Sequence, residues 1–199
     1  MEQQFQYYAF ISYKREDEKW AKWLQDRLRW YKLPSKLCRQ ITRLPKKVWP
    51  VFRDNTDLDS GRLEENIRHE LERSHYLIVI CSPEAARSPW VGKEVKYFAT
   101  LHGADKIIPF VVSGIPYSND IETECIHEQI KAISQEELLA INVREEGIGS
   151  FAMKKKRAFI RVVARLLDIK FNTLWQPYER ILRIRKWSTG IGVVLFLFV

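Results

Sequence analysis

The side chains of this chain that could do chemistry gather in three polar stretches. The stretches read FISYKRED, VFRDNTDLDSGRLEENI and SPEAARSPWVGKEV. In the third, Trp90 and Glu94 are four residues apart, so on a helix they share one face. A carboxylate there can stabilise a developing positive charge, and an indole can pack on a cationic ring. In the first, Lys14 and Arg15 can donate charged hydrogen bonds to an anionic group.

Each of these residues also has a purely structural interpretation. A helical glutamate such as Glu94 is usually solvated, and a tryptophan such as Trp90 usually packs in a core. Lys14 and Arg15 can equally belong to a solvated loop. Residue types and spacing alone leave both interpretations open.

The second stretch offers acids whose roles are equally open. Asp57 and Asp59 can bind a ligand, or they can act as acids near the N-terminus of a helix. Arg53 can pair locally with Asp54 and shape the loop without any other function.

Several catalytic and binding motifs are absent from the sequence. It contains no GxxxxGK[ST], no GxGxxG and no GxSxG, and no histidine pair has metal-ligand spacing. The cysteines, Cys38, Cys81 and Cys125, are odd in number and far apart. We therefore expect no metal site and no disulfide scaffold, and an intracellular, reducing compartment. The polar opening of the chain does not resemble a signal peptide.

The formal net charge of +8 is unevenly distributed. Residues 151–199 hold eleven basic and two acidic residues, a balance of +9, which leaves −1 for residues 1–150. Because no RNA- or DNA-binding motif accompanies this charge, we expect no nucleic-acid partner. The pattern indicates a near-neutral domain followed by a basic segment.

The last thirteen residues, WSTGIGVVLFLFV, carry no charge. As a helix they would span about 20 Å, short of a hydrocarbon core of about 30 Å. We expect either a membrane-spanning segment that is cut off part-way or a short natural anchor. A C-terminal core helix fits less well, because residues 195–199 are apolar on all sides. The basic residues at 180–186 predict that the domain lies on the cytoplasmic face of the cell membrane, single-pass or tail-anchored.

Strand-like and helix-like segments alternate along the chain. We predict strands at residues 6–13, 48–52, 76–81, 106–112 and 138–143, and main helices at 16–31, 62–73, 88–102 and 151–170. Pro109 predicts that its strand lies at an edge, or that the proline marks a strand end. This alternation predicts an α/β domain with a parallel sheet, whose ligand crevice lies beyond the carboxyl ends of the strands.

Four motifs at these strand ends resemble the TIR (Toll/interleukin receptor) domain. They are FISYKR, DLDSGRL, LIVICSP and SPWVGKEV, in that order within residues 6–112. The resemblance implies a flavodoxin-like five-stranded parallel sheet with helices on both faces. The sequence is similar in particular to the TIR domains of bacterial, membrane-associated proteins. We predict a TIR domain at residues 1–150, a basic helical extension at 151–187 and a partial transmembrane segment at 188–199.

Two features depart from the family pattern. The connection over residues 32–49 is longer and more basic than in compact TIR domains, and residues 55–61 lack the usual loop proline. These departures concern partner choice and loop geometry more than catalysis.

The resemblance also implies an activity, cleavage of the nicotinamide–ribose bond of NAD+. Glu94 matches the catalytic glutamate of the family's W-x-x-x-E pattern, and Lys14, Arg15, Asp59 and Trp90 match NAD+-contacting positions. Nicotinamide leaves as a neutral molecule and the ribose becomes oxocarbenium-like, so one carboxylate suffices without a general acid. We expect neither metal nor cofactor, with NAD+ as the substrate.

By the same resemblance, we expect a hydrolase or cyclase that self-associates through its TIR domains and serves antiphage defence. The alternative is a non-catalytic TIR–TIR adaptor at the membrane. A receiver or flavin-binding protein of the same topology is more remote, because no acidic pair ends the first strand to accompany Asp54.

Overall fold

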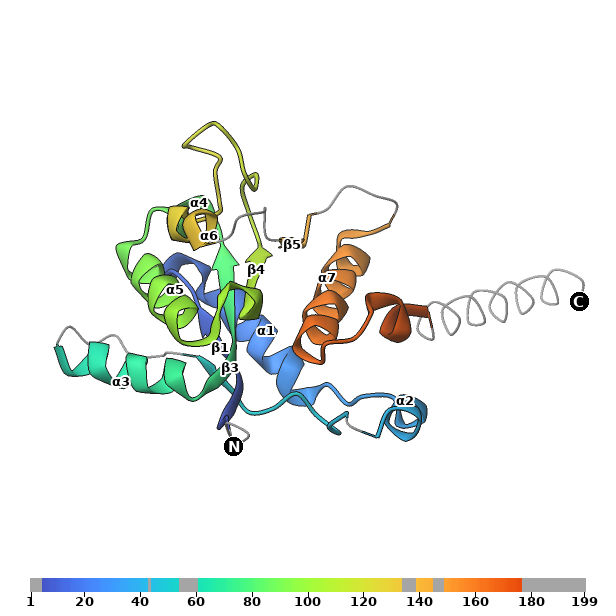
Figure 1. The fold of residues 1–199 in the computed structure, drawn as a ribbon. Coiled ribbons are helices and arrows are strands. Elements are labelled where there is room, and N and C mark those ends of the chain that lie inside the picture. The colour runs from blue at the N-terminus through green and yellow to red at the C-terminus, as the bar shows by residue number, and fades with distance from the viewer. Residues whose placement is uncertain (1–4, 43, 54–60, 134–138, 145–148, 177–199) are drawn as a thin grey trace, which may run out of the picture.

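Five parallel strands form one sheet with the order β2-β1-β3-β4-β5 (Figure 1). The computed structural model describes residues 5–42, 44–53, 61–133, 139–144 and 149–176, with the backbone alone at 61–64. The strands are β1 (Tyr7–Ser12), β2 (Val51–Arg53), β3 (Ser74–Cys81), β4 (Ile107–Val111) and β5 (Ile141–Asn142). This is the flavodoxin-like order. The predicted five-stranded parallel sheet is confirmed.

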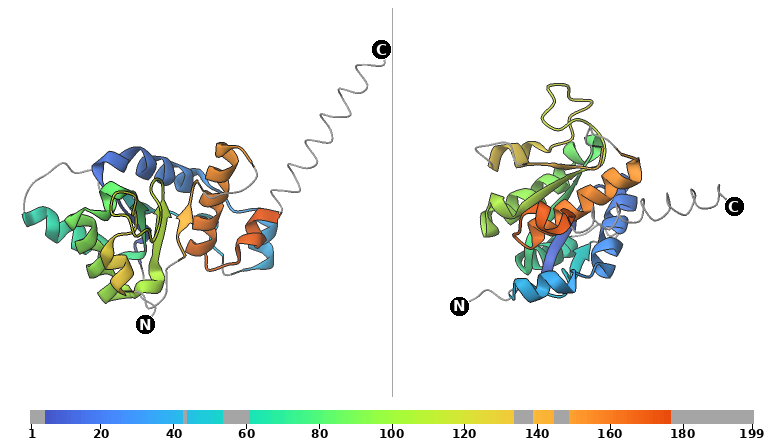
Figure 2. Two further views of the ribbon diagram at one scale, coloured as in Figure 1. Left: turned by 90° about the horizontal axis from the view of Figure 1, so that it is seen from above. Right: turned by 90° about the vertical axis from the view of Figure 1, so that its right-hand side faces the viewer.

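Helices cover both faces of the sheet (Figure 2). The labelled helices are α1 (Glu18–Trp30), α2 (Ser35–Gln40), α3 (Gly61–Glu72), α4 (Pro83–Ala86), α5 (Pro89–His102), α6 (Glu128–Ile133) and α7 (Phe151–Leu166), with 3-10 turns η1 (Arg15–Asp17) and η2 (Ala104–Lys106). Residues 171–176 are helical as well. Helices α1, α2 and α7 share one apolar core, whereas α3, α5 and α6 share the other. The sheet separates these two cores.

Strand β3 shows why its sequence is an uninterrupted apolar run. Ile78 and Ile80 belong to the core beneath α1 and α7, whereas Leu77 and Val79 belong to the core beneath α3 and α5. Successive side chains of a strand point to opposite faces, so a strand covered on both faces needs apolar residues throughout. Burial on both faces therefore accounts for the apolar run at residues 76–81.

Two serine–proline pairs begin helices, as the sequence predicts. The Ser82 hydroxyl accepts from the Ala85 amide at 3.1 Å, and the Ser88 hydroxyl accepts from the Val91 amide at 3.5 Å. In each case the following proline occupies the first turn, where its missing N–H costs nothing. Ser82 thus begins α4 and Ser88 begins α5.

The prediction that Pro109 marks an edge strand or a strand end is wrong, because Pro109 is the middle residue of β4. Strand β4 lies between β3 and β5, and Pro109 is level with Val79 of β3. The Val111 carbonyl accepts from the Val143 amide at 3.0 Å, so Pro109, two residues earlier, also faces the β5 side. Strand β5 pairs only from Phe110 onward. The proline is therefore tolerated because no β5 residue needs its N–H.

The long connections contain short helices that the sequence pattern did not define. Helix α2 lies within the basic connection before β2, and α6 lies near the end of the connection after β4. Strand β2 begins at Val51 rather than at Val48. Pro50 has no N–H, so its backbone can only accept hydrogen bonds. Its carbonyl accepts one from the Tyr8 amide at 2.8 Å.

Helix α7 packs on the sheet beside α1. Its residues Phe159, Val162 and Val163 are buried in the same core as β1, although we expected residues after 150 to form an extension. The helix ends at Leu166 rather than near residue 170, because Asp168 has a positive φ of 51°, a left-handed conformation that stops a helix.

The predicted membrane segment at 188–199 lies outside the described residues. Within the part of the chain that the structure describes, no helix has both the length and the apolar character needed to cross a bilayer.

Candidate active site

Glu94 lies in α5 and is only 6% exposed. Its Oε2 accepts a hydrogen bond of 2.5 Å from the hydroxyl of Ser12, the buried last residue of β1. A bond between a hydroxyl and a carboxylate is short and charge-assisted. Glu94 is therefore not the solvated helix residue that the sequence left open, because the fold holds its carboxyl group at the carboxyl end of β1.

A pocket of about 360 Å³ lies between α3 and α5, and both Trp90 and Glu94 line it. Trp90 is half-buried and packs on the apolar core beneath these helices. The Lys93 ammonium lies 5.4 Å from the centre of its indole ring. Trp90 thus serves both structural packing and the pocket wall, so its two interpretations are compatible.

The position of α5 depends on a close contact at Gly92. A Cβ added there would lie 2.5 Å from His127 Cε1, closer than packed atoms allow. His127 is itself fixed, because its Nε2 lies 3.1 Å from the Ser88 carbonyl and its Nδ1 accepts from the Gln129 amide at 3.0 Å. Burial lowers the pKa of His127, which favours the neutral ring. The glycine therefore lets α5 approach the segment before α6.

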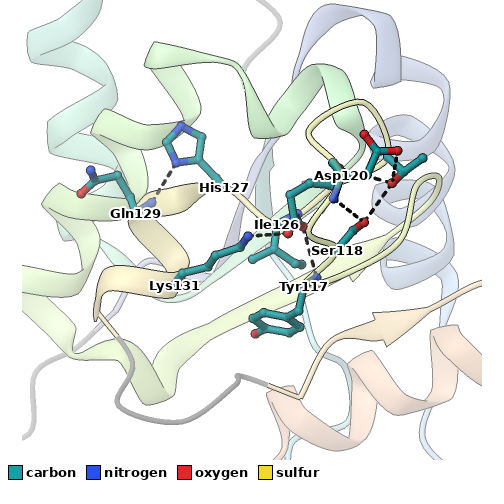
Figure 3. A network of polar contacts seen from close by, with 9 residues as sticks. Tyr117, Ser118, Asp120, Ile126, His127, Gln129 and Lys131 are labelled. Carbon is teal, nitrogen blue, oxygen red and sulfur yellow. Dashed lines mark hydrogen bonds and ion pairs between the residues drawn. The ribbon is translucent and has the colours of Figure 1, made fainter.

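The segment that carries His127 is held by its own polar network (Figure 3). Glu124 accepts from the amides of Tyr117 at 3.2 Å and Ile126 at 2.6 Å, and it also pairs with Lys131. Ser118 and Asp120 close the neighbouring turn, where the Asp120 amide donates to the Ser118 hydroxyl at 3.1 Å. This otherwise irregular connection can therefore present a fixed surface to α5.

The predicted basic pair follows directly after β1. Lys14 is half-buried and Arg15 is exposed at the start of η1. Ser12, which bonds Glu94, comes two residues before Lys14. The structure therefore brings the basic pair and Glu94 to the same strand end, although they are about 80 residues apart in sequence.

Asp59 lies outside the described residues, as do Asp54 and Asp57. The local pair of Arg53 with Asp54 therefore stays a prediction, whereas other contacts of Arg53, at the end of β2, are described. Its guanidinium donates to Gln25 at 3.1 Å, to Tyr13 at 3.1 Å and to Glu18 at 3.3 Å. Arg53 therefore joins the end of β2 to α1.

A second buried carboxyl group, that of Asp17, lies near this edge and was missed by the sequence analysis. Its Oδ2 accepts from the Ser82 hydroxyl at 2.5 Å, and the residue is 8% exposed. Burial raises the pKa of Asp17, and the hydrogen bond from Ser82 opposes that rise. No local pattern connects Asp17 with Ser82, because the two residues are 65 positions apart.

The buried cysteines have no visible role in this site. Cys81 packs within β3, and Cys125 is buried in the α3–α5 core. Burial raises the pKa of the Cys125 thiol to about 12, so it is protonated at neutral pH. Within the described ranges, histidine, cysteine, aspartate and glutamate side chains form no group of three that could hold a metal ion.

Comparisons with known proteins relate this architecture to a characterised group. Residues 9–146 match a family model described as TIR domain. A curated relative, the NAD(+) hydrolase ApTIR of Actinoplanes sp., is 36% identical over 110 residues. That match covers 54% of this chain but only 14% of the relative, so the chain spans a small part of that protein's length.

A solved structure with a similar fold is that of the TIR domains in the activated Roq1 resistosome recognising the effector XopQ. The TM-score is 0.50 at 14% identity, over 77% of this chain and 98% of the other. At this identity, the likeness concerns the fold alone.

Proposed function

The chain belongs to the TIR domain family, and from that membership we propose that it cleaves NAD+ between nicotinamide and ribose. The observation that carries the proposal is the buried Glu94 carboxyl group, which Ser12 holds at the carboxyl end of β1 and which lines a pocket together with Trp90. The similarity to a curated NAD(+) hydrolase supports the choice of substrate.

The proposed reaction needs only one catalytic carboxylate. The bond between ribose C1 and the nicotinamide nitrogen breaks, and its electron pair leaves with nicotinamide as a neutral molecule. The ribose develops oxocarbenium character, which the negative charge of Glu94 stabilises. Water then adds to C1 and releases a proton, yielding ADP-ribose. In a cyclase, a nitrogen of the adenine would replace the water as the nucleophile.

The neighbouring residues have proposed roles in binding. The Trp90 indole would pack against the nicotinamide ring or the sugar, and Lys14 and Arg15 would donate to the pyrophosphate. Asp59 would contact the substrate from the loop after β2. We propose no metal and no resident cofactor.

The setting of the enzyme is also part of the proposal. TIR domains of neighbouring copies would associate to complete the site. The segment at 188–199 would anchor the chain at the cytoplasmic face of the cell membrane and so raise the local concentration of copies. Cleavage of NAD+ would then act in bacterial defence against phage.

Nicotinamide release from NAD+ at high protein density tests the proposal. Glu94→Gln keeps the shape of the side chain and an acceptor for Ser12, but removes the charge. We expect turnover to fall at least about 100-fold. Glu128→Gln, an exposed exchange on α6, is the matched control and should keep wild-type turnover. Unchanged turnover in Glu94→Gln would remove Glu94 from the mechanism. Mass spectrometry of the product distinguishes hydrolase from cyclase.

A second candidate function is a non-catalytic TIR–TIR adaptor. The burial of Glu94 favours it, because a carboxyl group that is 6% exposed and bonded to Ser12 also suits a purely structural role. An adaptor would release no nicotinamide at any protein density, with or without Glu94.

A further inference from the structure

A groove of about 770 Å³ runs between α1 and α7, on the opposite side of the sheet from Glu94. Its lining is aromatic and basic, and includes Trp23, Trp30 and Phe159 together with the cations Arg27, Lys155 and Lys156. The described residues that line it include neither aspartate nor glutamate. We call this surface the α1–α7 groove.

Two large apolar side chains stand exposed along the groove. Trp30 is 73% exposed and Phe151 is 53% exposed, and both contribute to its lining. Phe151 lies beside Trp20, with ring centres 6.4 Å apart, and Trp30 is ten residues further along α1. The two exposed rings are thus separated by about 15 Å at 1.5 Å per helical residue. Exposed aromatic rings beside cations are typical of surfaces at a membrane interface.

Two cations of the groove, Lys155 and Arg27, repel each other. The Lys155 ammonium lies 4.5 Å from the ring centre of Trp20 and 4.3 Å from that of Trp23. Burial lowers the pKa of Lys155, and the nearby positive charge of Arg27 lowers it further. Helix α7 carries six basic residues and no acidic one. An anionic partner would relieve this repulsion.

The chain beyond the described residues favours a membrane over a soluble anion. The described part ends beside α7, where the Trp175 ring centre lies 5.8 Å from Cζ of Arg157. Only eleven residues separate this end from the apolar segment at 188–199, a reach of at most about 40 Å. A segment anchored in the bilayer would hold the groove within reach of the headgroups.

We infer that the α1–α7 groove docks on an anionic lipid surface, with Trp30 and Phe151 entering the interface and the cations binding headgroup phosphates. The inference rests on the proposed membrane anchorage. It does not depend on the chemistry at Glu94, because the groove and the candidate site lie on opposite faces of the sheet. Docking would fix which face of each copy is turned to the membrane and leave the α3–α5 face accessible.

The test uses the full chain in vesicles of phosphatidylcholine, with or without phosphatidylglycerol, labelled with brominated lipids. The difference in fluorescence quenching between the wild type and Trp30→Phe gives the contribution of Trp30 alone. We expect strong quenching only with the anionic lipid. The double variant R27E/K156E should weaken this contact at least tenfold, since each basic residue near an anionic leaflet contributes about 1 kcal/mol.

The control R87E/K96E makes the same change of charge directly after α4 and on α5, and should leave Trp30 quenching unchanged. Equal quenching in both vesicle types, or quenching that R27E/K156E leaves intact, would overturn the inference. So would lipid-free association of copies that R27E/K156E abolishes, or competition by millimolar inorganic phosphate. Nicotinamide release by R27E/K156E should match the wild type. If R27E/K156E loses docking but keeps turnover, the result supports the role of the α1–α7 groove. If no variant releases nicotinamide, the result contradicts only the proposed activity.

Discussion

Two buried carboxyl groups near the same end of the sheet make nearly identical contacts and differ in what surrounds them. Glu94 accepts from Ser12 and Asp17 accepts from Ser82, each at 2.5 Å. Glu94, however, also lines the pocket beside Trp90, and Asp17 does not. The comparison teaches that a serine–carboxylate contact does not by itself indicate a reactive group. Access to space for a ligand distinguishes the two.

Exchanging each carboxyl group for its amide is the most direct test of the difference between Glu94 and Asp17. We expect Glu94→Gln to lose nicotinamide release at least about 100-fold, because the stabilising negative charge is gone. Asp17→Asn should keep turnover within about threefold, since its side chain does not line the pocket. Assays of both variants at equal, high protein density measure this. Equal losses in the two variants would mean that the two carboxyl groups share one role.

Removing the two serine hydroxyls should separate positioning from stability. Ser12→Ala leaves Glu94 without this donor, so kcat should fall about tenfold with KM nearly unchanged, as expected for a positioning residue. Ser82→Ala removes both the cap of α4 and the bond to Asp17. It should cost about 2 kcal/mol of unfolding free energy with little change in kcat. Steady-state kinetics and denaturant unfolding of both variants test this division.

Gly92→Ala should disturb the Glu94 pair but not the Asp17 pair. The added Cβ would meet the buried His127 ring at 2.5 Å and push α5 away. We expect a net loss of about 1 kcal/mol, because overpacking outweighs the gain in helix propensity. Turnover should fall together with stability. Thermal unfolding and nicotinamide release provide the two readouts, and wild-type values in both would refute the close contact.

The smallest expected effect is the pH dependence of stability due to Asp17. Burial raises the pKa of Asp17 in the folded protein above its ordinary value of 3.8. At a pH between 3.8 and this raised pKa, the folded protein binds more protons than the unfolded chain. Stability therefore falls as the pH rises through this window, and the cost is complete above it. Asp17→Asn should raise the melting temperature by about 2 °C at pH 7, and this gain should shrink towards pH 3.8. The exposed exchange Asp26→Asn makes the same change of charge and serves as the control.

Much of the fold was predictable because local chemistry specifies it. The apolar run before Ser82 predicted a strand covered on both faces, and Ser88-Pro89 predicted the start of α5. Trp90 and Glu94 were identified by their spacing and by resemblance to a family pattern. These inferences depend on residues within a few positions of one another, where helix and strand periods determine which side chains share a face.

Other features could not be predicted because they join distant residues. Ser12 and Glu94 are 82 positions apart, and Ser82 and Asp17 are 65 apart. The interior place of Pro109 depends on how far β5 extends along β4. No local pattern carries such information.

The sequence by itself determined the order of the strands and main helices along the chain, the serine caps of α4 and α5, and the glutamate proposed for catalysis. Only the tertiary structure decided that Glu94 is buried against Ser12, that Gly92 must be a glycine, and that α1 and α7 together form a basic aromatic groove. The physical reason is that short-range periodicity is written in neighbouring residues, whereas burial, close contact and pKa depend on which elements the sheet brings together.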